Sequence, residues 1–219
     1  MAKRVGSRRR KKKRAARLLK SRTFRIAAIL LLLLLFGPLA FKGIRSALGV
    51  SAGIEEPELD VELLTVSPYN RPGLALDQVK GIVIHYTANP GASAIANRDY
   101  FESLKDGKTT SASAHFIVGL EGEIVQCIPT WEMAYASNDR NGDTLAIECC
   151  HPDETGKFNK KTYKSLVNLT AWLCQKYNLS AESVIRHYDV TGKDCPKYFV
   201  EHEKAWKQFK RDVEKKLDA

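Results

Sequence analysis

Three residues far apart in the chain, His85, His187 and Cys195, carry the imidazole and thiol groups that zinc binds readily. His187 and Cys195 flank a short segment that contains a glycine, and His85 ends the apolar run 81–85. Each of them alone is more often a buried thiol or a hydrogen-bonded histidine, so the indication comes from the three together. Three protein ligands leave the fourth zinc position for water, which is typical of catalytic sites. The sequence therefore predicts an open zinc site.

Two charged residues near these ligands could take part in hydrolysis. Glu148 lies in the apolar segment 145–149, where an unpaired carboxylate is costly to bury. It could pair with a Lys or Arg, or it could face the metal and accept a proton from water, and spacing alone leaves both interpretations open. Lys193 lies two residues before Cys195, where a cation would favour the thiolate and stabilise developing negative charge.

The other cysteines do not form the even-numbered framework that is typical of a disulfide-built domain. Cys149 and Cys150 are neighbours in a predicted strand, so their side chains should point to opposite faces of a sheet. We expect the four cysteines outside the zinc site to be small buried hydrophobic residues; they are Cys127, Cys149, Cys150 and Cys174.

The charge of +10 is concentrated in the N-terminal tail, residues 1–25, which hold thirteen Lys or Arg residues and no acidic residue. Residues 26–41 are uncharged and include six consecutive leucines. A helix of this length spans about 24 Å, and flanking Arg25 and Lys42 can reach the membrane interface. We therefore predict one N-terminal transmembrane helix over 26–41. The basic residues before it predict a cytoplasmic N-terminus and an extracytoplasmic domain in a single-pass protein of the cell membrane.

Two alternatives to this anchor follow from the same region. Val50-Ser51-Ala52 resembles a small-residue cleavage site, so the segment could be a secretory signal peptide and the protein secreted. The basic tail could also contact nucleic acid, but a solvated tail beside anionic lipid is preferred because the leucine run is otherwise unexplained. Outside the tail the charges nearly balance, so we expect no nucleic acid partner for the domain. We also expect the protein to be a monomer.

Beyond the anchor, the pattern predicts a stalk or linker over 42–66 and one domain over 67–219. The α/β fold class expected for this domain is a mixed β-sheet flanked by helices. Ser93 should cap the first helix, with Tyr100, Phe101 and Leu104 facing inward. The expected strands are 81–86, 114–118, 123–128, 144–149 and 183–187, and the expected helices are 94–105, 161–177 and 201–217.

Four segments occur in an order that resembles the zinc-dependent N-acetylmuramoyl-L-alanine amidases of type 2, relatives of the peptidoglycan recognition proteins and phage-lysozyme-type amidases. The segments are 81–87, 113–118, 145–148 and the stretch from His187 to Cys195-Pro196. The resemblance covers roughly residues 68–200. It implies a mixed sheet with flanking helices and a zinc ion in a surface groove. It also implies hydrolysis of the amide between N-acetylmuramic acid and the L-alanine of the peptidoglycan stem peptide.

The resemblance also implies roles for individual residues. His85, His187 and Cys195 match the metal ligands, Glu148 matches the acid that serves as catalytic base in one branch, and Lys193 matches a lysine beside the metal. Another branch has a tyrosine directly before the histidine of the His-Phe strand.

This chain has Ala114 at that position and so resembles the glutamate branch. His115 fits the family strand, and we expect it to contact substrate or to orient its neighbours. Ala136 departs from the histidine that relatives often carry after an aromatic residue, which places one substrate contact in doubt.

Two classes of function compete at this stage. The first is a peptidoglycan hydrolase that uses zinc-activated water. The alternative is a non-catalytic, membrane-anchored peptidoglycan-binding module, and members of that class commonly lack the cysteine ligand. The presence of Cys195 together with Glu148 and Lys193 favours the enzyme.

Overall fold

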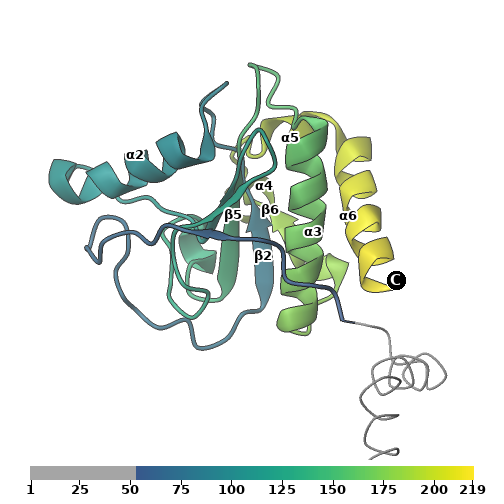
Figure 1. The fold of residues 1–219 in the computed structure, drawn as a ribbon, viewed down its shortest axis with the longest axis horizontal. Coiled ribbons are helices and arrows are strands. Elements are labelled where there is room, and N and C mark those ends of the chain that lie inside the picture. Colours follow the sequence, from purple (N-terminus) through teal and green to yellow (C-terminus); the bar gives the residue numbers. More distant parts are fainter. Residues whose placement is uncertain (1–52) are drawn as a thin grey trace, which may run out of the picture. The chain divides into compact units, whose positions relative to one another are not determined.

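The computed structural model describes residues 53–219, which form a mixed six-stranded sheet with helices on both of its faces (Figure 1). The strands lie in the order β1-β4-β3-β5-β2-β6. Their bounds are β1 (Asp60–Val61), β2 (Gly81–Ile84), β3 (Phe116–Val118), β4 (Ile124–Gln126), β5 (Thr144–Cys149) and β6 (Val184–Arg186). The expected mixed sheet flanked by helices is thus confirmed.

Four neighbouring strands, β3, β5, β2 and β6, run parallel to one another. β4 is antiparallel to β3, as expected for the hairpin, and β1 is parallel to β4. Because the carboxyl ends of parallel strands meet at one edge of a sheet, the residues at the carboxyl ends of β2, β5 and β6 are brought together there.

Three longer helices cover the sheet. They are α2 (Ala94–Gly107), α3 (Lys160–Lys176) and α6 (Glu203–Leu217), and shorter helical segments are η1 (Asn138–Arg140), η2 (Ala181–Ser183), α4 (His187–Thr191) and α5 (Lys197–Glu201). α3 contacts both the sheet and α6, whereas α2 contacts β3 and β4. Figure 1 shows α2 on one side of the sheet and α3 with α6 on the other.

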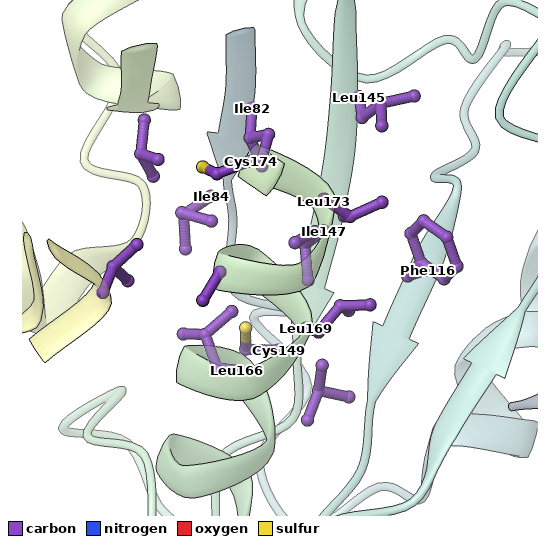
Figure 2. Close-up of a cluster of buried hydrophobic side chains, with 14 of the residues drawn as sticks. Ile82, Ile84, Phe116, Leu145, Ile147, Cys149, Leu166, Leu169, Leu173 and Cys174 are labelled. Atoms are coloured by element: carbon purple, nitrogen blue, oxygen red, sulfur yellow. The ribbon is translucent and has the colours of Figure 1, made fainter. Parts of the chain in front are cut away.

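The α3/α6 face of the sheet holds the larger hydrophobic core. Alternate residues of β2 and β5, among them Ile84 and Ile147, pack against the buried stripe of α3 (Figure 2). Since strand side chains alternate between the faces, the intervening residues form a second core under α2. Cys149 belongs to the first core and Cys150 to the second, which confirms the prediction of opposite faces. All five cysteines are buried free thiols.

The helix α2 begins as its sequence predicts. The Ser93 side chain accepts a hydrogen bond from the backbone N–H of Ala96, which satisfies one of the unpaired donors at the helix start. Phe101 and Leu104 are buried, but Tyr100 is 53% exposed, so the prediction that Tyr100 faces inward is wrong. Tyr100 directly precedes Phe101, and adjacent helical residues do not share a face.

The C-terminal helix is shorter than predicted. The expected helix over 201–217 is interrupted at His202, where the backbone leaves the helical region (φ −126°, ψ 73°), and α6 starts at Glu203. Trp206, Phe209 and Val213 are buried on one face of α6, as their spacing predicts.

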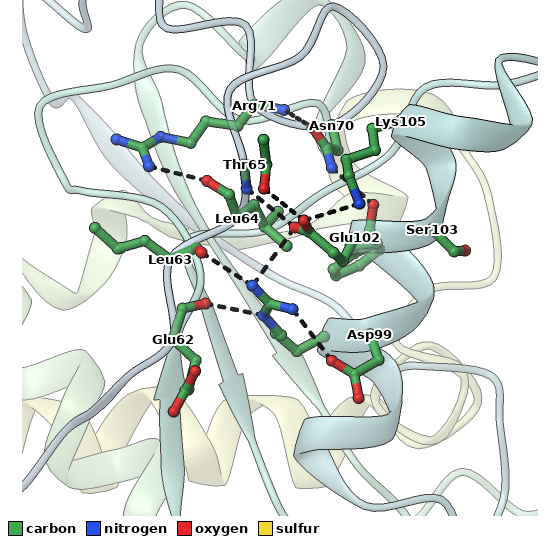
Figure 3. A network of polar contacts seen from close by, with 12 residues as sticks. Glu62, Leu63, Leu64, Thr65, Asn70, Arg71, Asp99, Glu102, Ser103 and Lys105 are labelled. Carbon is green, nitrogen blue, oxygen red and sulfur yellow. Dashed lines mark hydrogen bonds and ion pairs between the residues drawn. The ribbon is translucent and has the colours of Figure 1, made fainter.

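The expected stalk over 42–66 is wrong for its last part, because residues 60–66 pack on the domain. β1 adds to the edge of the sheet beside β4, and Leu64 is only 1% exposed. Arg98 of α2 donates to the backbone carbonyls of Glu62 and Leu63, and Glu102 accepts from both the backbone and the hydroxyl of Thr65 (Figure 3). Polar side chains of α2 therefore hold a segment whose sequence shows no regular period.

The predicted tail over 1–25, the predicted transmembrane helix over 26–41 and the first part of the predicted stalk lie outside the described residues. Within residues 53–219, every helix is too short or too polar to cross a bilayer.

Candidate metal and catalytic site

The carboxyl ends of three parallel strands bring the predicted site together. Ile84 of β2 is in register with Ile147 of β5 and with Arg186 of β6. The residues that directly follow Ile84, Ile147 and Arg186 in sequence are His85, Glu148 and His187. The Arg186 side chain points toward α5 and α6, where it contacts the Phe199 carbonyl and Glu203. Because strand side chains alternate, the three following residues share the opposite face, the face of α2.

The three predicted metal ligands converge. The ligand atoms of His85, His187 and Cys195 all lie within 4.8 Å of one another, and all three residues are buried. The thiol Sγ of Cys195 is 3.8 Å from Nδ1 of His85. The two imidazole ring centroids are 4.7 Å apart. These residues form a candidate metal site built from two nitrogens and one sulfur.

The set fits zinc in both chemistry and spacing. Zinc–nitrogen bonds of about 2.0–2.1 Å and zinc–sulfur bonds of about 2.3 Å place tetrahedral ligand atoms roughly 3.3–3.7 Å apart. The observed separations require only a small closure around such an ion. A site of imidazole and thiolate ligands also suits zinc better than the hard cations magnesium and calcium, which prefer oxygen.

The protonation states of the ligands suit metal binding. Burial lowers the pKa of His85 well below its usual value, and the neighbouring His187 and Lys193 act in the same direction. Burial and Lys193 also lower the pKa of His187. Both imidazoles are therefore neutral at neutral pH, the form in which histidine binds metals.

The thiol of Cys195 needs a cation to ionise. Burial and the nearby Glu148 raise its pKa to about 12, and a hydrogen bond from the backbone of Tyr86 and the charge of Lys193 act against this rise. A bound divalent metal deprotonates a coordinating thiol outright. The loop that carries Cys195 is anchored by a hydrogen bond from the Tyr188 N–H to the Cys195 carbonyl, 2.9 Å long.

Glu148 faces the candidate metal site rather than an ion-pair partner. Its Oε1 lies 4.0 Å from Nδ1 of His85, and within the described part of the chain its Oε2 has no hydrogen-bond partner although it is buried. Burial raises the pKa of Glu148 to about 8, and the charge of Lys193 opposes this rise. A divalent cation would oppose it further, because an opposite charge favours the carboxylate. A poorly satisfied carboxyl with a strongly perturbed pKa is typical of catalytic groups.

A cleft of about 380 Å³ opens over these residues. Lys193 is exposed at its wall, close enough to act on the pKa values of both histidines and of Glu148. The other walls come from the segment after β2, the C-terminal half of α2 and the loops before β3 and β5; they are lined by Tyr86, Thr87, Ala88, Phe101, Ser111, Ala112, Ser113, Tyr135, Ala136, Asn138 and Asn141. The structure thus brings five of the six predicted site residues to one cleft, all except His115.

His115 is a correction to the expected site. Its side chain is fully buried, its Nδ1 accepts from the Ala146 N–H at 3.0 Å, and its Nε2 lies 2.9 Å from the Glu132 carbonyl. Burial lowers its pKa to about 4. With both ring nitrogens bonded to backbone, His115 links the start of β3 to β5 and to the loop at Glu132, and it does not line the cleft. This is the orienting role that the sequence left open.

Two residues that sequence reasoning did not single out contact the histidine ligands. Ser137 Oγ lies 3.3 Å from Nε2 of His85, and Asn138 Oδ1 lies 3.0 Å from Nε2 of His187. Ser137 is 1% exposed, and Asn138 has a positive φ of 52°. A polar cluster of Ser, Asn and Gly near 137–142 was a visible signal, but such clusters usually mark nothing more than a turn.

Residues 75–198 match the family model described as N-acetylmuramoyl-L-alanine amidase. This chain belongs to that family.

Curated relatives agree with this assignment. A probable N-acetylmuramoyl-L-alanine amidase of Bacillus licheniformis is 38% identical over 164 residues, which are 69% of this chain and 46% of the relative. The N-acetylmuramoyl-L-alanine amidase CwlL of the same species is 38% identical over 165 residues, 69% of this chain and 45% of CwlL. The chain thus spans less than half the length of these curated relatives.

Solved structures share the fold. The catalytic domain of XlyA superposes with a TM-score of 0.61 at 28% identity and covers 72% of this chain and 99% of that domain. A mutant endolysin from Bacillus subtilis gives the same TM-score at 30% identity, with 72% and 99% coverage. The described domain therefore corresponds to almost the whole of each of these structures.

Proposed function

We propose that this protein is a peptidoglycan hydrolase that cleaves the amide between N-acetylmuramic acid and the L-alanine of the stem peptide. The observation that carries the proposal is the convergence of His85, His187 and Cys195 beside a carboxyl group, Glu148, in an open cleft. The names of the relatives supply the substrate class. A binding module would have no need of a buried and poorly satisfied carboxyl at this place.

We further propose that the metal is Zn²⁺, held by His85, His187 and Cys195. When bound there, zinc would polarise the scissile carbonyl and lower the pKa of the attacking water. The two neutral imidazoles and one thiolate would leave the ion with a net positive charge, which this chemistry requires.

Glu148 and Lys193 divide the remaining work. Glu148 accepts a proton from the attacking water and passes it to the leaving amine, since its raised pKa makes it both a competent base and a competent acid near neutral pH. Lys193, exposed at the cleft wall, stabilises negative charge that develops on the carbonyl oxygen. Bound substrate would cover the cleft and exclude bulk water, which would strengthen the electrostatic effects of both Glu148 and Lys193.

We also propose that residues 26–41 anchor the chain in the cell membrane with the domain on the extracytoplasmic side, where peptidoglycan lies. The uncharged leucine-rich segment and the basic residues before it support this proposal. Secretion after cleavage near residue 52 is the alternative. Fractionation of cells followed by mass measurement of the chain would distinguish an intact membrane-bound protein from a released, shortened one.

The function is tested by incubating the zinc-loaded full chain with purified sacculi. We expect new free amino groups on L-alanine and no new sugar reducing ends. Binding to sacculi without release of either group would instead support the non-catalytic module, and new reducing ends would indicate a glycosidase.

A further inference from the structure

One short turn contacts both histidine ligands on the side away from the candidate metal site. Ser137 Oγ lies 3.3 Å from Nε2 of His85, and Asn138 Oδ1 lies 3.0 Å from Nε2 of His187. His85 directly follows β2 and His187 begins α4 directly after β6, whereas the two contacting residues are adjacent in sequence. A shift of this turn would therefore act on both ligands at once.

The turn is itself tightly organised. The Oδ1 of Asn141 accepts hydrogen bonds from the backbone N–H groups of Ala136 and Ser137, at 3.0 and 2.6 Å. The N–H of Arg140 donates to the Ser137 carbonyl at 2.9 Å. The Arg140 carbonyl in turn accepts from the hydroxyl of Thr144, the first residue of β5. The turn is thereby fixed to the same strand that carries Glu148.

The backbone of the turn is held in a conformation that most residues avoid. Asn138 has φ +52°, which asparagine tolerates better than other non-glycine residues. This conformation starts η1 and presents the Asn138 side chain to His187, and η1 packs on α4, which His187 begins. This strained residue is therefore in direct contact with a histidine ligand.

The hydrogen bonds have a consequence for the chemistry of the ligands. The amide Oδ1 of Asn138 can only accept, so the His187 Nε2 that faces it carries the proton. The neutral ring then has its lone pair on Nδ1, which is free to bind a metal. The Ser137 hydroxyl, fully buried against His85, can hold that ring in the same tautomer, with Nδ1 directed toward Cys195.

We propose that Ser137 and Asn138 are positioning residues that hold both histidines in the Nε2-protonated tautomer and pre-form the zinc site, with Asn141 fixing the turn that carries them. This rests on the proposed zinc site, and so on the proposed function. Outer partners of this type typically change metal affinity by about 10–100-fold when they are removed.

The test measures zinc affinity of the full chain by competition with a chromogenic chelator, together with the ring-nitrogen NMR signals of the zinc-free histidines. Asn138→Gly removes the acceptor but suits the positive φ, and Asn138→Asp keeps the acceptor. We expect Asn138→Gly to weaken zinc binding about 10-fold or more, and Asn138→Asp to restore most of the affinity. The zinc-free Asn138→Gly chain should also show His187 as a mixture of tautomers.

Asn178 provides a matched control, because it has nearly the same positive φ, 53°, and lies in the turn after α3. Asn178→Gly should leave zinc affinity and the histidine signals unchanged. Ser137→Ala should weaken zinc binding and disturb His85 rather than His187. Equal affinity in Asn138→Gly and the unchanged chain, or an equal loss in Asn178→Gly, would overturn the proposal.

These readouts separate this inference from the proposed function. Zinc affinity that depends on Asn138 in a chain that releases nothing from sacculi would keep the positioning role and reject the hydrolase. Hydrolysis with zinc affinity indifferent to Asn138 would keep the hydrolase and reject the positioning role.

Discussion

The two faces of the central sheet are built for different purposes. The face under α3 and α6 holds the larger apolar core, which includes Phe209, Leu169 and Leu173, all fully buried. On the other face α2 packs mainly over β3 and β4, and the cleft opens where the carboxyl ends of β2, β5 and β6 carry His85, Glu148 and His187. The first face supplies stability, and the second supplies a place where polar groups remain poorly satisfied.

One sheet can supply both a stable core and a reactive cleft, because successive side chains of a strand point to opposite faces. Ile84 and Ile147 face the larger core, and His85 and Glu148, one residue later, face the cleft. The packed apolar residues fix the position of each strand, and they thereby also fix the position of the functional residue that follows them. Substitutions on the cleft face should therefore alter chemistry with little loss of stability, and those on the opposite face should do the reverse.

The largest effect on catalysis is expected from Glu148→Gln on the cleft face. Removing the base should lower the rate of hydrolysis by about 10²–10⁴-fold, because general acid–base catalysis contributes on that order. Zinc content and the midpoint of thermal unfolding should stay close to those of the unchanged chain, since the carboxyl has few partners to lose. Full hydrolytic activity at equal zinc content would remove Glu148 from the mechanism.

The matching change on the opposite face is Phe209→Ala. Phe209 is fully buried and packs against Tyr163, Phe199 and Trp206. The free energy of unfolding should fall by about 3–5 kcal/mol, as is usual for a large core side chain. Denaturant unfolding measures this loss, and zinc affinity of the folded fraction should not change. A large drop in zinc affinity would show that the two faces are not independent.

A smaller effect is expected at Glu102 on α2, which holds the segment around Thr65. Burial acts to raise its pKa, but hydrogen bonds from Thr65 and the charges of Lys105 and Arg98 outweigh this and lower the pKa to about 2. Because the pKa is lowered, the ionised carboxylate stabilises the fold at pH values above about 4.5, the ordinary pKa. This stabilisation is lost as the pH falls toward 2.

Glu102→Gln should therefore cost about 1–3 kcal/mol at neutral pH and flatten the loss of stability between pH 4.5 and 2. Urea unfolding across this range measures both quantities. Identical pH profiles for the two proteins would contradict the role assigned to Glu102.

The smallest effect concerns the cap of α2. Ser93→Ala should cost about 1 kcal/mol, because the Ala96 N–H loses its acceptor. Ser93→Asp, which keeps an acceptor and adds a favourable charge at the helix start, should keep or raise stability. Thermal unfolding of the three proteins is sufficient to rank them, and an unstable Ser93→Asp protein would argue against the capping role.

Much of the fold could be predicted because its signals are local. The apolar run of β2, the three-and-four spacing in α3 and the Ser93 cap all depend on residues close together in sequence. Residues 60–66 were mistaken for stalk because their order comes from distant partners, Arg98 and Glu102 among them. The break at His202 has no clear signal in the sequence.

The site divides in the same way. His85, His187 and Cys195 could be predicted from residue type and from the family resemblance, and the structure brings them together. The sequence left two roles open for His115, because its burial and its hydrogen bonds depend on Ala146 and Glu132, which are distant in sequence. The contacts of Ser137 and Asn138 could not be predicted, since they depend on how one turn packs against two separate strands.

The most direct test of the central claim is a zinc titration of the metal-free full chain with sacculi as substrate. We expect no release of L-alanine amino groups without metal, a rate that rises linearly with zinc up to one equivalent per chain, and a plateau beyond it. Cys195→Ser should need a far higher zinc concentration to reach any activity. Release at full rate by the metal-free chain, or by Cys195→Ser without added zinc, would contradict the account.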